Sequence, residues 1–336
     1  MEAMQSSPPC LTEDQSSSKR RRVDAADRLG DLPDCLLHGI ISCLGSRQAV
    51  QTSVLSRRWR HLWRDVPCVA IDEREFVGDQ WQRFEDFADH MLTSIPLNTR
   101  LDSFRLHLVT RTSMDGYATS DRWIRRGLRY FPAAVDIRTA LGSTVYWRPH
   151  LSYPAAAASQ QQPNLSVTGS CAAGFTKRLT TLRLVGVNLA TGFMEDLGRH
   201  CPALEELHME GCSMKLSAVT SPTLRTFVVI EARHSVPCVH LTIAAAHLAY
   251  LRLDIPYNGE ECYCVTGEAA PEPLASMAEA SIRLTETARQ QGDNRARRKR
   301  KLEFLKSMRR FLGLLPNVTK LHLAGFTTKV IIDSRS

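Results

Sequence analysis

The sequence contains no long apolar run, and this absence excludes one class of protein at the outset. Nowhere in the 336 residues does a run approach the roughly 18 apolar residues that a membrane-spanning helix needs. Residues 1–18 are polar and lack the apolar core of a secretory signal peptide. The sequence therefore predicts a protein of the nucleus, of the cytoplasm, or of both.

The motifs of common enzyme classes are missing as well. There is no Gly-x-x-x-x-Gly-Lys-Ser/Thr phosphate loop, no Gly-x-Gly-x-x-Gly fingerprint and no Gly-x-Ser-x-Gly nucleophile turn. The histidines are dispersed, and none stands at a recognised spacing from a cysteine or a carboxylate. We expect no cofactor and no enzymatic activity, although distant residues can assemble a catalytic site.

Cysteine is present, but not in the spacing that metal binding requires. The ten cysteines are scattered through apolar segments, and no Cys-x-x-Cys pair occurs. Cys262-x-Cys264 and His200-Cys201 lack the second pair of ligands of a structural zinc site. Without a secretory signal, the sequence predicts free, buried thiols and no metal centre.

Positive charge is concentrated in two short runs rather than spread over the chain. The net charge is +8, and the remainder is slightly acidic once residues 19–22 and 295–301 are set aside, so we expect no broad nucleic-acid-binding face. The first run resembles a nuclear import signal, and a solvated basic tail is the alternative. The second is interpreted as the solvated start of a helix, with an import signal or an acidic partner as alternatives. The import-signal candidates are Lys19, Arg20, Arg21 and Arg22.

Apolar residues are concentrated near the N-terminus, in a unit of three short predicted helices. The first helix begins near Pro33, carries one wide apolar stripe and ends at Gly45. A second helix begins at Ser46, and a third after Ser56. Units of fewer than about 40 residues rarely form a stable core alone, so part of this apolar surface is expected to meet a partner.

The residues of this unit resemble a known family. Leu-Pro-x-x-Leu-Leu-x-x-Ile at 32–40 and Ser-Val-Leu-Ser-Arg-Arg-Trp-Arg-x-Leu-Trp at 53–63 resemble the F-box of plant F-box proteins with leucine-rich repeats. The resemblance runs from Asp27 to about Asp72. It implies a unit that binds the Skp adaptor, and through it cullin. The matching positions are Leu32, Pro33, Leu36, Leu37, Ile40, Val54, Leu55, Trp59, Leu62 and Trp63.

Two expectations about these positions differ in kind. Leu32, Pro33 and Ile40 are predicted to contact the adaptor directly. For Trp59 and Trp63 two interpretations stay open: adaptor contact, or packing inside the F-box or against the first repeat.

The rest of the chain repeats the pattern apolar-x-x-apolar-x-apolar. Copies centred at residues 182, 207, 227 and 251 are 25, 20 and 24 residues apart, which is the period of leucine-rich repeats. The phrase His200-Cys201-Pro202 … Leu204 … Leu207 resembles the cysteine-containing plant variety. The predicted fold is an α+β or α/β solenoid. A three-helix F-box is followed by an irregular leucine-rich-repeat horseshoe with parallel strands on its concave face and helices on its convex face.

The expected domain organisation has three parts. Residues 1–27 form a disordered basic, Ser-rich tail, residues 28–72 the F-box, and residues 73–336 the leucine-rich-repeat domain. Insertions are expected at about 152–175 and 257–300.

The family resemblance implies a non-catalytic substrate-receptor subunit of a Skp–cullin–F-box ubiquitin ligase, whose repeats recruit an unknown protein substrate. Strand residues predicted to line the concave face are the weaker candidates for substrate contact, with a solvated strand face as the alternative. They are Arg183, Glu206, His208, Arg225, Arg252 and His322.

Two other function classes stay open. One is a nuclear, basic, nucleic-acid-associated protein. The other is a ligase-independent scaffold or a truncated receptor, suggested because the sequence stops soon after a repeat strand without an obvious capping element.

Overall fold

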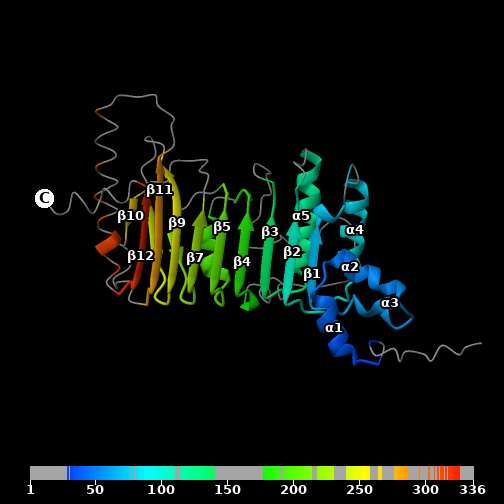
Figure 1. Ribbon diagram of the computed structural model, residues 1–336. Coiled ribbons are helices and arrows are strands. Elements are labelled where there is room, and N and C mark those ends of the chain that lie inside the picture. Colours follow the sequence, from blue (N-terminus) through cyan, green and yellow to red (C-terminus); the bar gives the residue numbers. More distant parts are fainter. Residues whose placement is uncertain are drawn as a thin grey trace, which may run out of the picture.

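A computed structural model describes most of the chain between residues 29 and 325 (Figure 1). The predicted tail at 1–27 with its import-signal candidates, the insertion at 152–175, and the basic residues after Arg295 up to Lys301 lie outside the described residues. The described residues are 29, 31–76, 78, 81–109, 114–140, 177–189, 192–213, 218–230, 240–257, 264–266, 276–286, 295, 302, 306, 309, 311–313, 315 and 317–325.

The N-terminal unit consists of four short helical elements. They are α1 (Asp34–Ser42), α2 (Ser46–Gln51), the 3-10 helix η1 (Thr52–Val54) and α3 (Trp59–Leu62). Leu37 and Ile41 of α1 and Trp59 and Leu62 of α3 are buried. These inward side chains form one small core that is continuous with the core of the rest of the molecule.

A nine-stranded, fully parallel sheet forms the body of the molecule, and Figure 1 shows its strands side by side in one row. The N-terminal unit lies at the β1 end of this row. In order along the sheet, the strands are β1 (Cys68–Asp72), β2 (Ser103–His107), β3 (Ala134–Arg138), β4 (Thr181–Val185), β5 (Glu206–Glu210), β7 (Thr226–Ile230), β9 (Tyr250–Tyr257), β11 (Glu279–Glu286) and β12 (Lys320–Gly325).

The apolar repeat pattern places alternate side chains on opposite faces of this sheet. In β4, Leu182 and Leu184 are buried, whereas Arg183 between them points to the other face. The same alternation holds in β1, β2 and β3. One face of the sheet therefore builds the core, and the other carries polar side chains; we call the latter the open face.

Two helices accompany the first strands of the sheet on its core face, and a third helix, with short strands, follows β4 farther along. The helices are α4 (Trp81–Ser94), α5 (Met114–Leu128) and α7 (Phe193–His200). A 3-10 turn, η2 (Glu73–Glu75), follows β1. A second parallel sheet has the order β10 (Cys264–Thr266), β8 (His240–Ala244), β6 (Ala218–Thr220), and β6 packs against α7. The predicted α/β class is thus confirmed as a mostly parallel sheet with helices.

One expectation about the domain plan needs correction. Residues 257–300 were predicted to be an insertion, but 279–286 within them form β11, which pairs with β9 on one side and β12 on the other. Among the side chains described at 279–283, Ala280 and Ile282 are buried. The small Ala280 stands where other strands carry a large apolar residue, so the repeat pattern did not reveal this strand.

Candidate functional site

The N-terminal unit carries large apolar side chains on its surface. On α1, Leu36 and Ile40 are 54% and 43% exposed, and their spacing of four residues places them on one side of the helix. Val54 at the end of η1 and Leu55 after it are 85% and 62% exposed. These four residues are called the exposed apolar set below. Isolated exposed apolar residues are ordinary, whereas four on so small a unit make it the candidate docking region of the molecule.

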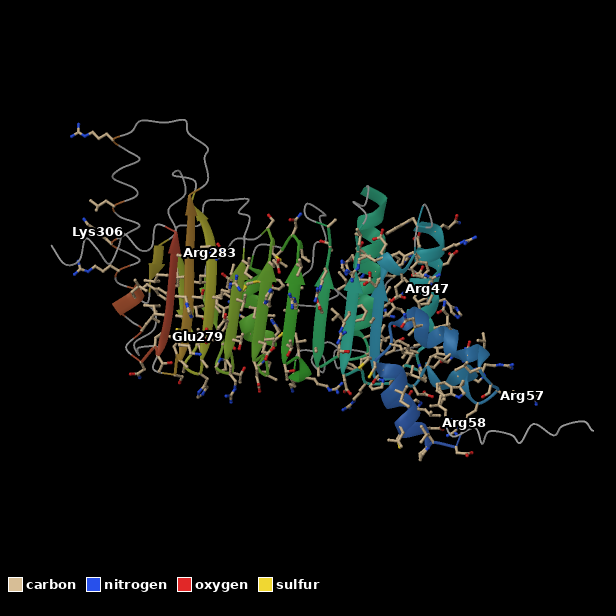
Figure 2. All side chains as sticks on the ribbon, viewed as in Figure 1. Arg47, Arg57, Arg58, Glu279, Arg283 and Lys306 are labelled. Atoms are coloured by element: carbon tan, nitrogen blue, oxygen red, sulfur yellow. The ribbon has the colours of Figure 1, made fainter. Side chains whose placement is uncertain are left out.

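The start of α1 is held in place by Arg58, which directly precedes α3. Arg58 donates through Nη2 to Asp34 Oδ1 over 2.6 Å, and the same nitrogen donates to the carbonyl oxygen of Leu32. Pro33 is exposed, and Leu32 is partly buried against the core. Arg58 and Asp34 are both well exposed, so the ion pair itself contributes at most about 1 kcal/mol. Figure 2 shows Arg57 at the outer end of the unit, away from the sheet.

Four of the ten predicted adaptor-binding residues are in the core instead. Leu37, Trp59, Leu62 and Trp63 are all buried, so they do not form part of a surface for a partner. For the two tryptophans, this supports the interpretation that they pack inside the molecule. Leu36 and Leu37 are adjacent in sequence, and the helical period of 3.6 residues sends them to different sides of α1.

The N-terminal unit is attached to the sheet by specific polar contacts. The hydroxyl of Ser46 accepts a hydrogen bond from the backbone N–H of Ala70 in β1 over 2.8 Å. Arg47 donates to the backbone carbonyl of Glu75, and its guanidinium lies 4.5 Å from the centre of the Phe76 ring. Figure 2 shows Arg47 at the β1 end of the sheet. Ser46 is the first residue of α2, and its side chain is hydrogen-bonded to the strand β1 rather than capping the helix.

On the open face, the strand register joins distant residues into rows. Arg183 pairs with His208, then Val228, Arg252, Ser281 and His322 follow on successive strands. In the other direction, Asp136 of β3, Arg105 of β2 and Ala70 of β1 continue the same row. Arg183, His208, Arg252 and His322 therefore share one line across the sheet.

The other two predicted substrate contacts do not lie on this line. Glu206 is exposed in the neighbouring row at the start of β5. Arg225 precedes β7, which starts at Thr226, so its placement in a strand is wrong. Arg225 faces Glu205 across 3.9 Å at the edge where the strands begin. At the far end of the sheet, Figure 2 places Glu279 and Arg283 on β11.

His208 lies among charged residues in the middle of the open face. Burial lowers the pKa of His208 below its ordinary value of 6.5, and the nearby Arg183 and Arg252 lower it further, while Glu210 opposes them. The Nε2 of His208 lies 3.5 Å from Glu210 Oε2, a separation that gives electrostatic attraction but a poor hydrogen bond.

We expect His208 to make folding stability fall as the solution is acidified. The pKa of His208 is lower in the folded chain than in the unfolded chain, where it is near 6.5, so the unfolded chain binds the proton more readily. The free energy of unfolding therefore decreases as the pH falls through and below 6.5. In His208→Gln, the loss between about pH 7.5 and pH 5.5 should be smaller. Urea unfolding at several pH values measures it, with His247→Gln, at an exposed position, as the control. Identical pH slopes for His208→Gln and the unmutated chain would contradict the assignment.

Where the N-terminal unit meets the sheet, the surface is hollowed into a cavity of about 570 Å³. The α1–α2 turn at residues 42–45 and the η2 turn border it, and the open faces of β1, β2, β3 and β4 complete its wall. Of the predicted substrate contacts, Arg183 alone lines this cavity. Its other Asp, Glu, Arg and His residues are Asp72, Arg74, Glu75, Arg105, His107, Asp136 and Arg138.

Three pairs organise most of this charge. Arg74 donates to Asp72 over 2.6 Å, and burial is outweighed by these hydrogen bonds, so the pKa of Asp72 lies below its ordinary value. Arg138 donates to Asp136 over 2.7 Å. His107 Nδ1 lies 3.6 Å from Asp72, but burial of its ring keeps the pKa of His107 below the usual 6.5.

The described residues contain little that resembles a catalytic or metal centre. Burial raises the pKa of the Cys201 thiol to about 12 and that of Cys212 to about 11, which makes both poor nucleophiles at neutral pH. Cys35 and Cys43 are exposed, contrary to the expectation of buried thiols. Over the described part of the chain, no three His, Cys, Asp or Glu residues are grouped to hold a metal ion. In the same part, no helix is long and apolar enough to cross a membrane.

Comparison with known proteins identifies the N-terminal unit. The family model for the F-box domain matches residues 29–69. A meiotic F-box protein of Oryza sativa subsp. japonica is 38% identical over 325 residues, which cover 92% of this chain and 62% of the relative. F-box/LRR-repeat protein 13 of Arabidopsis thaliana is 27% identical over 261 residues, or 72% of this chain and 55% of the relative. Another A. thaliana F-box/LRR-repeat protein is 29% identical over 286 residues, covering 79% and 81%.

The family match shows that the chain carries an F-box domain. The relatives also confirm the resemblance to plant F-box/leucine-rich-repeat proteins, which extends well beyond the F-box. The chain spans about half to three-fifths of the length of several of these relatives, namely 62%, 48% and 55%.

The sequence patterns did not reveal the cavity or most of its lining. Arg105, Asp136 and Arg138 stand at alternate strand positions, and that alternation signals only that they face away from the core. Their convergence with the α1–α2 turn depends on how the F-box packs on β1. Local spacing of apolar and polar residues does not reveal that packing.

Proposed function

We propose that the chain is a substrate-receptor subunit of a Skp–cullin–F-box ubiquitin ligase. Its F-box binds the Skp-type adaptor, and its sheet recruits a protein substrate for ubiquitin-dependent degradation. One observation carries the proposal: the domain that matches the F-box model leaves Leu36, Ile40, Val54 and Leu55 exposed to solvent. The chain itself is proposed to perform no bond chemistry.

Burial of these side chains accounts for the affinity that the proposal requires. Apolar surface removed from water contributes about 25 cal/mol per Å², and a few large residues usually dominate an interface. The buried Leu37, Trp59, Leu62 and Trp63 are assigned the separate task of holding the exposed residues in position. The proposed adaptor surface is therefore the exposed apolar set together with Pro33 and the exposed part of Leu32.

The repeat domain is proposed to act by proximity. Its parallel sheet supports the interpretation of residues 73–336 as a leucine-rich-repeat solenoid whose open face is the inner, substrate-facing side. Holding a substrate lysine near a charged ubiquitin-conjugating enzyme raises its effective concentration without any new chemistry. The contacts between α2 and β1 support a fixed orientation of the open face relative to the adaptor.

Two further proposals concern organisation and location. We retain an F-box at about 28–72, with its last residues forming β1 of the sheet. The nucleus, the cytoplasm or both remain the proposed location, for which the basic run at 19–22 is the sequence feature that favours import.

Capture by a Skp-type adaptor tests the proposal. The purified full-length chain should bind immobilised adaptor, and Leu36→Ala/Ile40→Ala should weaken binding about thirtyfold, or ~2 kcal/mol, because each truncation removes apolar contact area. Leu97→Ala is the matched control, since Leu97 is 81% exposed but lies between α4 and β2, outside the F-box.

Two results would count against adaptor binding through this surface. One is no capture of the unmutated chain. The other is equal capture of the unmutated chain and the Leu36→Ala/Ile40→Ala variant, with both shown to be folded by circular dichroism.

A further inference from the structure

The cavity between the F-box and the first four strands contains cationic groups that its own acids do not neutralise. Asp72 is paired with Arg74, and Asp136 is bound by Arg138 through both carboxylate oxygens, at 3.0 Å and 2.7 Å. In each pair the negative charge of one aspartate balances the positive charge of one arginine. These two pairs therefore contribute no net charge to the cavity.

The third acid, Glu75, is associated with the F-box side of the cavity. Its carboxylate lies against the α1–α2 turn, where a β-carbon placed on Gly45 would come within 2.3 Å of Oε1. Burial and the nearby Asp72 raise the pKa of Glu75, whereas the positive charges of Arg47 in α2 and Arg74 in η2 lower it. Because Arg74 is paired with Asp72, the charge that is left to balance Glu75 is that of Arg47 in the F-box, and not that of Arg105 or Arg183 in the sheet.

Two arginines of the cavity, Arg105 and Arg183, are left without an acidic partner inside the cavity. Arg105 is exposed and makes no hydrogen bond or ion pair with any described residue. Arg183 has a single distant acidic neighbour, Glu210 Oε2 at 4.0 Å, and its Nε is buried without a hydrogen-bond partner among the described groups. Buried donors are normally satisfied, so Arg183 has unused hydrogen-bonding capacity.

The strand register places these two arginines on either side of Asp136. Arg105 pairs with Asp136, and Asp136 pairs with Arg183, so the three occupy one row on β2, β3 and β4. Adjacent strands lie about 4.8 Å apart, which separates the two arginine backbones by about 10 Å. Long side chains from both can reach a single group bound between them in the cavity.

We propose that this cavity binds a carboxylate-bearing segment of the substrate, with Arg105 and Arg183 as its cationic contacts. The proposal rests on the proposed function as a substrate receptor and names the chemical class of its substrate. The guanidinium group presents paired N–H donors in a plane that matches a carboxylate, and such charge-assisted hydrogen bonds are among the stronger ones in proteins. The recessed position weakens solvent screening relative to an exposed strand face.

Three of the other five predicted substrate contacts fit this role less well. Burial lowers the pKa of His208, Arg225 lies 3.9 Å from Glu205, and His322 lies 4.0 Å from Glu279. The cavity also adjoins the F-box, whose orientation is fixed by the contacts of Ser46 and Arg47. A segment bound there is held close to the adaptor end of the molecule.

Binding of a labelled, end-capped hexaglutamate peptide to the full-length chain in complex with adaptor tests the proposal. The unmutated chain should bind this probe, and both Arg105→Glu and Arg183→Glu should weaken binding at least about tenfold, because each replaces attraction with repulsion. Arg199→Glu on α7 makes the same change of charge at an exposed position outside the cavity and should leave binding unchanged. A hexalysine peptide should not bind.

The outcomes separate this proposal from the proposed function. If hexaglutamate does not bind, or binds equally to Arg105→Glu and Arg199→Glu, the cavity proposal is overturned even though adaptor capture is intact. Displacement of the peptide by millimolar inorganic phosphate but not by acetate would also overturn it, in favour of a phosphate ligand. Loss of adaptor capture by the unmutated chain overturns the proposed function instead.

Discussion

Replacing Trp123 with alanine should lower the free energy of unfolding by about 3–5 kcal/mol, the range seen when a large aromatic side chain is removed from a core. Trp123 lies in α5 and is completely buried. Its ring is 5.3 Å from that of Phe84 in an edge-to-face arrangement and 5.9 Å from that of Trp81, both in α4. The substitution therefore opens a cavity between the two helices.

A polar contact adds to this loss. The indole N–H of Trp123 donates to Asp89 Oδ1 over 2.8 Å, and Asp89 also accepts hydrogen bonds from Arg122 and Arg126. Trp123→Phe keeps most of the ring but removes the N–H donor, so its cost should be the smaller of the two. Chemical denaturation of both variants provides the measurement. A loss below 1 kcal/mol for Trp123→Ala would mean that α4 and α5 do not pack as described.

The second large effect is expected from adding one methyl group. Gly127 lies in α5, and a β-carbon at this position would come within 2.4–2.6 Å of three ring atoms of Phe104, a fully buried residue of β2. Gly127→Ala should destabilise the protein by about 1–3 kcal/mol through overpacking. The value of 1–3 kcal/mol is the net loss of stability: the cost of overpacking is larger than the gain of roughly 1 kcal/mol that alanine has over glycine inside a helix.

Gly39 provides a matched control for this substitution. It also lies inside a helix, α1, but no atom lies within 4 Å of its added β-carbon. Gly39→Ala should therefore be neutral or stabilising by up to about 1 kcal/mol. Adding Phe104→Leu to Gly127→Ala should recover part of the loss, because the smaller side chain vacates the space. Destabilisation of equal size at Gly39 and Gly127 would show that crowding against Phe104 is not the cause.

Local pattern was sufficient to predict much of the fold. The spacing of Leu182 and Leu184, or of Leu251 and Leu253, indicated strands because alternate side chains of a strand share one face. The apolar stripe of α1 indicated a helix for the same kind of reason. In both cases the signal resides in residues close together in sequence. It therefore required no knowledge of how distant parts of the chain pack.

Features that depend on packing were beyond this reasoning. β11 was missed because Ala280 is small, although the pairing of β11 with β9 and β12 buries it completely. Within the F-box, a family motif marks Leu36 and Leu37 alike, but only their contacts with the rest of the unit decide which is exposed. The cavity beside Arg105 required the F-box and four strands to be placed together.

The hydrogen bond between Ser46 and Ala70 has a consequence for the exposed edge of the sheet. β1 is the terminal strand of the sheet, and terminal strands present unpaired backbone groups that can add a strand from another molecule. Helix α2 lies against β1, and the Ser46 hydroxyl occupies the N–H of Ala70. Contact with α2 thereby protects this edge against pairing with another molecule, and a chain that kept β1 but lacked the helices at 34–62 would lose that protection.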